Sequence, residues 1–134
     1  MTEGANILCK KLKENSMLKV AGAFDAMSAK LVELNNFDAV WAGSFAISAT
    51  HALPDASILT MTDFLKSTEN MVDACNIPVI ADCDTGFGGP ANVSHAVKKY
   101  EKQWNMSVTA TYINYSMAAS SAEGGAGGRP TTDC

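Results

Sequence analysis

The sequence lacks most of the features that mark a partner of nucleic acid, a membrane protein or a structural zinc site. Only 18% of its residues are charged and its net charge is −4, so it offers no basic surface for nucleic acid or an anionic membrane. No apolar run approaches the ~18 residues that a membrane span requires. The four cysteines form no CxxC pair, and no histidine lies at a zinc-ligand spacing from them.

The first residues also lack the apolar stretch of a signal peptide. Residues 1–16, MTEGANILCKKLKENS, mix polar and charged residues with isolated apolar ones. We therefore expect a cytoplasmic chain that has neither a membrane nor nucleic acid as a partner. What the chain does have is 134 residues, of which 47% are hydrophobic. That is enough for one domain with a hydrophobic core.

Apolar runs and helical patterns alternate along most of the chain. The runs cover residues 17–24, 37–45 and 77–82, and helical patterns cover 6–16, 25–35, 60–75 and the stretch from Pro90 to about Lys102. Residues 60–63, TMTD, fit a helix N-cap signature, and Pro90 suits the first position of a helix. Residues 46–59, AISATHALPDASIL, contain a proline and are predicted to form a loop.

This β-α-β-α-β-α order predicts an α/β fold. The strands are continuous apolar runs, which is typical of a parallel sheet covered on both faces. In such sheets ligands bind beyond the carboxyl ends of the strands. Three segments fall at those ends, and we expect them to lie close together: Gly22 to Asp25, Trp41 to Phe45, and Asp82 to Gly89.

The segment DCDTGFGG, residues 82–89, is the most informative of the three. Asp82 and Asp84 are two positions apart on an extended chain, so their carboxylates point to the same side, and Cys83 is expected to face the opposite side and to be buried. Two carboxylates at a strand end suit Mg²⁺, which prefers oxygen ligands, and the glycines allow backbone N–H groups to approach an anion. The alternative is that both aspartates only cap the loop and the next helix.

Four motifs together resemble the phosphoenolpyruvate mutase/isocitrate lyase superfamily. The motifs are GAFDAMSAKLVE (22–33), FDAVWAGSFAISATHALPD (37–55), ILTMTDFL (58–65) and IPVIADCDTGFGGPANV (77–93). Within the superfamily, Trp41 and the segment LPDASILTMT look most similar to the phosphoenolpyruvate mutase and phosphonopyruvate hydrolase subgroup. The resemblance implies the N-terminal part of a (β/α)₈ TIM barrel, with three to four βα units and parallel strands. It also implies Mg²⁺ as cofactor, and members are usually oligomers, which suggests a homo-oligomer.

The resemblance implies a role for individual residues. Asp82 resembles the direct Mg²⁺ ligand, and Asp84 and Asp55 resemble the carboxylates that reach the metal through water; Asp55 and Asp84 are the catalytic candidates, and Asp82 and Asp84 the metal candidates. The substrate would be phosphoenolpyruvate or phosphonopyruvate. Its carboxylate would meet the backbone around Gly43, Ser44 and Phe45, and Trp41 would form one wall of the pocket.

The character of the sequence changes after about residue 102. The family's fourth strand ends in an acidic motif, whereas residues 108–120, VTATYINYSMAAS, contain no acid, and residues 121–134 are rich in glycine. We therefore expect a partial barrel over residues 1–104 and a divergent, disordered tail over 105–134. Two alternatives stay open beside a mutase-like enzyme of carbon–phosphorus chemistry: a phosphonopyruvate hydrolase, and a non-catalytic barrel fragment with a residual Mg²⁺ or anion site.

Overall fold

The computed structural model describes residues 3–14 and 17–104, and the predicted tail at 105–134 lies outside them. The elements follow in the order α1 (Glu3–Glu14), β1 (Val20–Ala23), α2 (Ala26–Leu34), β2 (Ala39–Ala42), α3 (Ser44–Thr50), α4 (Met61–Ala74), β3 (Val79–Ala81) and α5 (Pro90–Trp104). The α/β order predicted from the sequence is confirmed. The helix α3 was not predicted, because residues 46–59 were expected to be loop throughout.

The sheet consists of three strands in the order β1-β2-β3, all parallel. Gly22 is paired with Trp41 and Trp41 with Ile80, while the next row joins Ala23, Ala42 and Ala81. Successive residues on a strand face opposite sides of the sheet, so these two rows belong to opposite faces. The register therefore decides which side chains share a face at the carboxyl ends of the strands.

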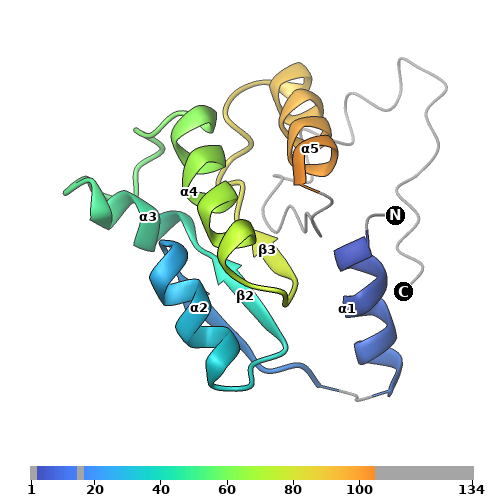
Figure 1. Ribbon diagram of the computed structural model, residues 1–134. Helices are drawn as coiled ribbons and strands as arrows, with labels where there is room; N and C mark the ends of the chain where they lie inside the picture. The colour runs from blue at the N-terminus through green and yellow to red at the C-terminus, as the bar shows by residue number, and fades with distance from the viewer. Residues whose placement is uncertain (1–2, 15–16, 105–134) are drawn as a thin grey trace, which may run out of the picture.

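Helices α2 and α4 pack side by side over one face of this sheet (Figure 1). The strand residues that point toward them are buried, and the core also takes in Ile47, Phe64, Leu65 and Met71. On the opposite face Gly22 is exposed and Trp41 and Ile80 are only partly buried. In the part of the chain that the structure describes, this second face is therefore more open at the carboxyl ends of the strands than the face under α2 and α4.

Local hydrogen bonds fix where the helices begin. Asp25 caps α2 by accepting from the backbone N–H of Ser28 (2.7 Å), and the Ser28 hydroxyl accepts in return from the N–H of Asp25. Thr60 and Asp63 form the same reciprocal box at α4, as the TMTD signature predicted. Pro90 opens α5, also as predicted. At the amino-terminal ends of the strands, Lys11 on α1 forms an ion pair with Asp38, which directly precedes β2 (2.8 Å).

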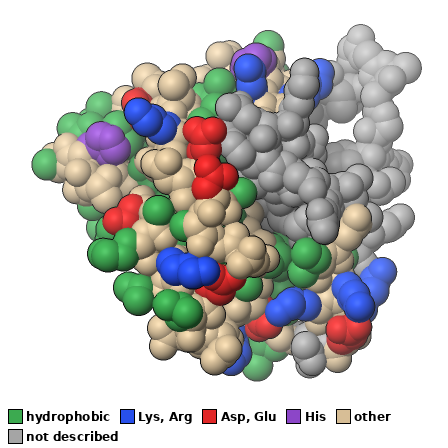
Figure 2. Space-filling view, viewed as in Figure 1, with side chains coloured by type: hydrophobic (Ala, Val, Ile, Leu, Met, Phe, Trp, Pro, Cys, Tyr) green, Lys and Arg blue, Asp and Glu red, His purple; other side chains and the backbone are tan. Residues whose placement is uncertain are grey.

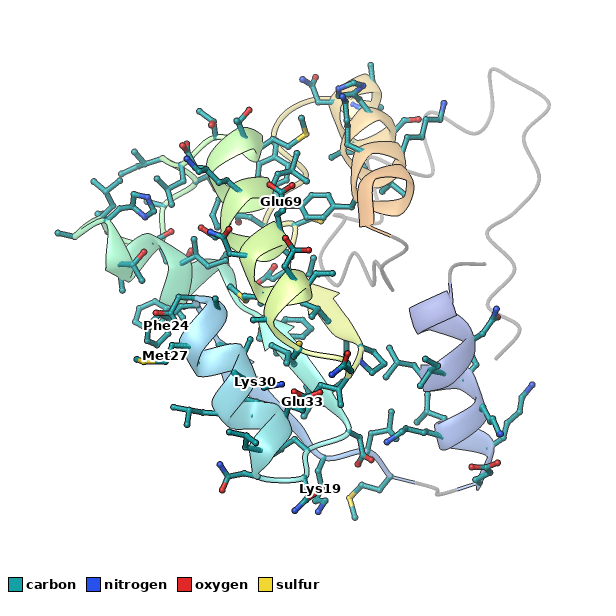
Figure 3. The ribbon with its side chains drawn as sticks, in the orientation of Figure 1. Lys19, Phe24, Met27, Lys30, Glu33 and Glu69 are labelled. Carbon is teal, nitrogen blue, oxygen red and sulfur yellow. The ribbon has the colours of Figure 1, made fainter. Side chains whose placement is uncertain are left out.

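The outer side of α2 carries an exposed apolar surface. Ala29 and Val32 are the buried residues of this helix, whereas Met27 is 69% exposed, Leu31 52% and Leu34 65%. Phe24 and Met27 lie together at the amino end of the helix, and apolar side chains cover the surface over α2 (Figures 2 and 3). The helix over 25–35 is thus correctly predicted, but its regularly spaced large residues point away from the core.

Two substitutions on α2 separate its buried side from its exposed side. Val32→Ala removes buried methyl groups next to the sheet and should lower the free energy of unfolding by about 1–3 kcal/mol. Leu31→Ala removes an exposed side chain and should change it by less than about 0.5 kcal/mol. Urea unfolding monitored by circular dichroism measures both, and equal losses would contradict the orientation of the helix.

The cap of α4 predicts a pH-dependent contribution to stability. Hydrogen bonds from the side chain and the backbone of Thr60 hold the pKa of Asp63 below its ordinary value of 3.8. The contribution is therefore fully present above the unfolded-state pKa and is lost as the pH falls through the lower folded-state pKa. Asp63→Ala should cost about 1 kcal/mol at pH 7, a difference that shrinks below pH ~3.8.

The matched control for this cap is Asp73→Ala near the carboxyl end of the same helix. Asp73 is exposed, and the helix dipole disfavours an acid there, so its removal should not lower stability. Unfolding free energies from urea titrations between pH 3 and 7 test both variants. A loss for Asp63→Ala that stays constant with pH would show that the charge of Asp63 does not contribute.

Candidate active site

Asp82 links the ends of β2 and β3 through both its backbone and its side chain. Its backbone N–H donates to the Ala42 carbonyl (3.0 Å), which continues the parallel ladder one residue beyond β3. Its side-chain Oδ2 accepts from the hydroxyl of Ser44 (3.0 Å) and from the Ser44 backbone N–H (3.2 Å). Oδ1 accepts from the backbone N–H of Asp84 (3.0 Å). Three donors therefore fix the orientation of a partly buried carboxylate.

Asp84 links this strand end to the loop between α3 and α4. Its Oδ2 accepts from the hydroxyl of Ser57 at 2.7 Å. Asp55 lies two residues before Ser57 in the same loop and is exposed. The structure thus brings Asp82, Asp84 and Ser44 together, while Asp55 remains on the loop that Ser57 fastens to Asp84. Sequence reasoning missed Ser57, since no motif distinguishes this serine from the polar residues around it.

Trp41 and Asp82 lie on the same face of the sheet. Trp41 pairs with Ile80, and Asp82 follows Ile80 by two residues, so all three point away from α2 and α4. The indole ring also lies against Gly43, where an added Cβ would be 3.0 Å from Trp41 Nε1. Phe45 is 69% exposed, whereas Ser44 is buried at the start of α3. The open face therefore carries both the indole ring of Trp41 and the carboxylate of Asp82.

Two of the three glycines in the 82–89 turn are required by its geometry. Gly86 has φ +86°, and a Cβ there would lie 2.5 Å from Val93 Cγ2 on α5; Gly88 has φ +141° and faces Asn92. Gly89 has open space around it. Asp84 and Phe87 also adopt positive φ, of 49° and 63°. The turn is therefore tightly wound between β3 and α5.

Cys83 is buried in the core, as the alternation of the strand predicts. Burial, with a smaller contribution from the neighbouring charge of Asp82, raises the pKa of Cys83 to about 12. Burial likewise raises the pKa of Tyr100, which packs in the same core from α5. Both groups are therefore neutral at physiological pH, and Cys83 has no thiolate to offer as a nucleophile.

A hollow of about 390 Å³ opens beside Asp84. It lies between the loop before α4 and the first turns of α5. Ser57, Asp84, Thr85, Asn92 and His95 supply its polar groups, and neither Trp41 nor Asp82 lines it. The two residues that share the open face of the sheet are therefore not part of its lining.

The residues present fit Mg²⁺ better than a metal that needs many protein ligands. Within residues 3–14 and 17–104, no group of three or more His, Cys, Asp or Glu side chains gathers as a metal cluster. Mg²⁺ typically binds through one or two carboxylates and keeps several waters. Asp82 and Asp84 supply that donor set at the edge where parallel α/β proteins bind ligands, and they would hold the ion.

A parallel sheet with carboxylates at its carboxyl edge is the arrangement of barrel-type α/β enzymes. The profile described as phosphoenolpyruvate phosphomutase matches residues 8–110, and the chain belongs to that family. The superfamily indicated by the sequence motifs is thereby confirmed. In the part of the chain that the structure describes, no helix is long and apolar enough to cross a bilayer.

The relatives catalyse several reactions. The 2,3-dimethylmalate lyase of Eubacterium barkeri is 44% identical over 92 residues, which are 68% of this chain and 32% of the lyase. The phosphonopyruvate hydrolase of Variovorax sp. is 38% identical over 90 residues, which are 67% of this chain and 31% of the hydrolase. The chain therefore spans about a third of the length of these relatives.

Solved structures agree with this assignment. Phosphoenolpyruvate phosphomutase from Streptomyces platensis subsp. rosaceus has a TM-score of 0.71 at 42% identity, covering 74% of this chain and 34% of the mutase. A phosphonopyruvate hydrolase in complex with oxalate and Mg²⁺ has a TM-score of 0.70 at 37% identity, covering 75% of this chain and 35% of the hydrolase. These relatives are TIM-barrel members of the superfamily, so the three parallel strands correspond to part of such a barrel.

Gly86 and Gly89 form a matched pair for testing the turn. Gly86→Ala places a Cβ against Val93 at a positive φ, and should lower the free energy of unfolding by at least about 2 kcal/mol. Gly89→Ala meets nothing within 4 Å and should change it by less than about 0.5 kcal/mol. Thermal and urea unfolding measure both variants. A stable Gly86→Ala protein would contradict the conformation of the turn.

Proposed function

We propose that this chain provides the Mg²⁺-binding and carboxylate-binding part of a phosphoenolpyruvate mutase-like site for carbon–phosphorus chemistry. The observation that carries the proposal is the fixed Asp82 carboxylate, on the same open face of the sheet as Trp41 and at the end of β3. Family membership supports it, as does the phosphonopyruvate hydrolase solved with oxalate and Mg²⁺. The substrate class is a 2-oxo acid or enol acid, with phosphonopyruvate and phosphoenolpyruvate as the specific candidates.

Each residue has a task in this proposal. Asp82 is the direct ligand of Mg²⁺, while Asp84 and Asp55 hold water molecules around the ion. When bound, Mg²⁺ supplies positive charge that stabilises the enolate form of the substrate. Gly43 allows the Trp41 ring to lie against the backbone at the start of α3, since a side chain there would meet that ring.

In this proposal two aromatic side chains shield one side of the reacting bond from water. Trp41 forms the wall beside the substrate and Phe45, exposed at the start of α3, lies at the rim. In a mutase the phosphoryl group moves between carbon and oxygen of the same molecule, so keeping water out separates rearrangement from hydrolysis. A phosphonopyruvate hydrolase, which instead transfers the phosphoryl group to water, is the second candidate, supported by the 38% identity to the Variovorax enzyme.

Phosphorus NMR of the purified 134-residue chain with phosphonopyruvate and Mg²⁺ tests the reaction. Formation of phosphoenolpyruvate identifies a mutase, and release of phosphate identifies a hydrolase. An unchanged spectrum favours the non-catalytic alternative. Proton NMR with 2,3-dimethylmalate provides the remaining comparison, because conversion of that compound would place the chain with the carbon–carbon lyases.

The binding part of the proposal has its own test. Asp82→Asn keeps the shape of the side chain but removes its charge, and it should weaken Mg²⁺-dependent binding of oxalate by at least about 100-fold, because a direct metal ligand must be ionised. Isothermal titration calorimetry of the full chain measures the affinity. Asp73→Asn, on the exposed end of α4, is the matched control and should bind as the wild type does. Equal affinity for all three proteins would rule out Asp82 as the ligand.

A further inference from the structure

The two carboxylate oxygens of Asp82 accept different numbers of hydrogen bonds. Oδ2 receives two donors, the backbone N–H and the hydroxyl of Ser44, whereas Oδ1 receives only the N–H of Asp84. An ionised carboxylate offers about four lone-pair positions, two on each oxygen. Three of the four are therefore taken by protein donors, and the remaining one belongs to Oδ1.

The position of Ser44 follows from the fold around it. Ser44 is the first residue of α3, directly after the turn at Gly43 that ends β2, and it is only 6% exposed. The hydrogen bond from the Asp82 N–H to the Ala42 carbonyl places Asp82 next to the end of β2, where α3 begins. The Ser44 hydroxyl is thus held next to Oδ2 by the ladder between β2 and β3.

This occupancy limits how Asp82 binds a cation. With both positions of Oδ2 taken, only Oδ1 has an open lone pair, so the carboxylate coordinates through one oxygen. Mg²⁺ requires near-octahedral geometry, and a bidentate carboxylate, with its small bite angle, strains it. Ca²⁺ accepts carboxylates through one or both oxygens and takes 6–8 ligands. A carboxylate restricted to one oxygen is therefore suited to the smaller ion.

We propose that the hydroxyl of Ser44 makes Asp82 a one-oxygen ligand and thereby sets the preference of this site for Mg²⁺ over Ca²⁺. This inference rests on the proposed function, in which Asp82 is the direct ligand. Ser44 acts through Asp82 and is a positioning residue in this role. Removing its hydroxyl opens the second position on Oδ2, and Asp82 becomes able to bind through both oxygens.

The test is the ratio of Mg²⁺ to Ca²⁺ affinity, measured by calorimetry with the chloride salts and a fixed concentration of oxalate on the full chain. Ser44→Ala should weaken Mg²⁺ binding by about 10–100-fold, the range for partners that orient a metal ligand. Ca²⁺ binding should stay unchanged or strengthen. A merely structural role for Ser44 would weaken the binding of both ions by the same factor.

Control variants separate the hydroxyl from packing. Ser44→Gly removes the same oxygen and should give the same change in ratio, while Ser44→Thr keeps a hydroxyl and should keep the wild-type ratio. Ser48→Ala is the matched control, because Ser48 is a buried serine on the same helix that makes no contact with Asp82 among the hydrogen bonds of the described residues. Circular dichroism and melting temperatures without divalent cations show whether each variant is folded.

The outcomes distinguish this inference from the proposed function. Cation binding that survives Asp82→Asn overturns the site itself, and the inference with it. Loss of binding in Asp82→Asn with an unchanged ratio in Ser44→Ala and Ser44→Gly overturns the inference alone. If the Ser44 variants do not fold, the wild-type protein still decides, because Ca²⁺ affinity equal to or higher than Mg²⁺ affinity contradicts the proposal.

Discussion

The parallel pairing of β2 with β3 is the constraint on which the candidate site depends. The pairing of Trp41 with Ile80 and of Ala42 with Ala81 brings the carboxyl ends of the two strands to one level. There the main-chain bond from Asp82 to Ala42 is reinforced by the two donors of Ser44. The same register places Trp41 and Asp82 on the open face and Cys83 in the core. The hydrogen bonds that pair the ends of β2 and β3 are therefore also the ones that position the carboxylate of the candidate site.

The elements with a strong local signal could be predicted from the sequence. The TMTD box, Pro90 and the three apolar runs each have a local physical cause, and the strands and helices they predict are present. The burial of Cys83 followed from simple alternation along the strand. The positions of Asp82 and Trp41 at the carboxyl ends of their strands followed from the general rule for parallel α/β sheets.

Features that depend on tertiary packing could not be predicted in the same way. Helix α3 lies in a segment of small residues with a proline nearby, which weakens any periodic signal. On α2 the buried residues are the small Ala29 and Val32, because α4 packs closely there, while the larger residues remain outside. The contact from Ser57 to Asp84 joins two loops, and such a contact leaves no pattern in either loop. The role of each site residue remains a proposal.

The bond between Ser57 and Asp84 has a consequence for motion. Both residues adopt positive φ, of 54° and 49°, a conformation that costs a side-chain-bearing residue on the order of 1–3 kcal/mol. A hydrogen bond of 2.7 Å joins the side chains at these two positions. The bond couples the loop that carries Asp55 to the turn after β3, so a change in the conformation of Asp84 also changes the contacts of that loop.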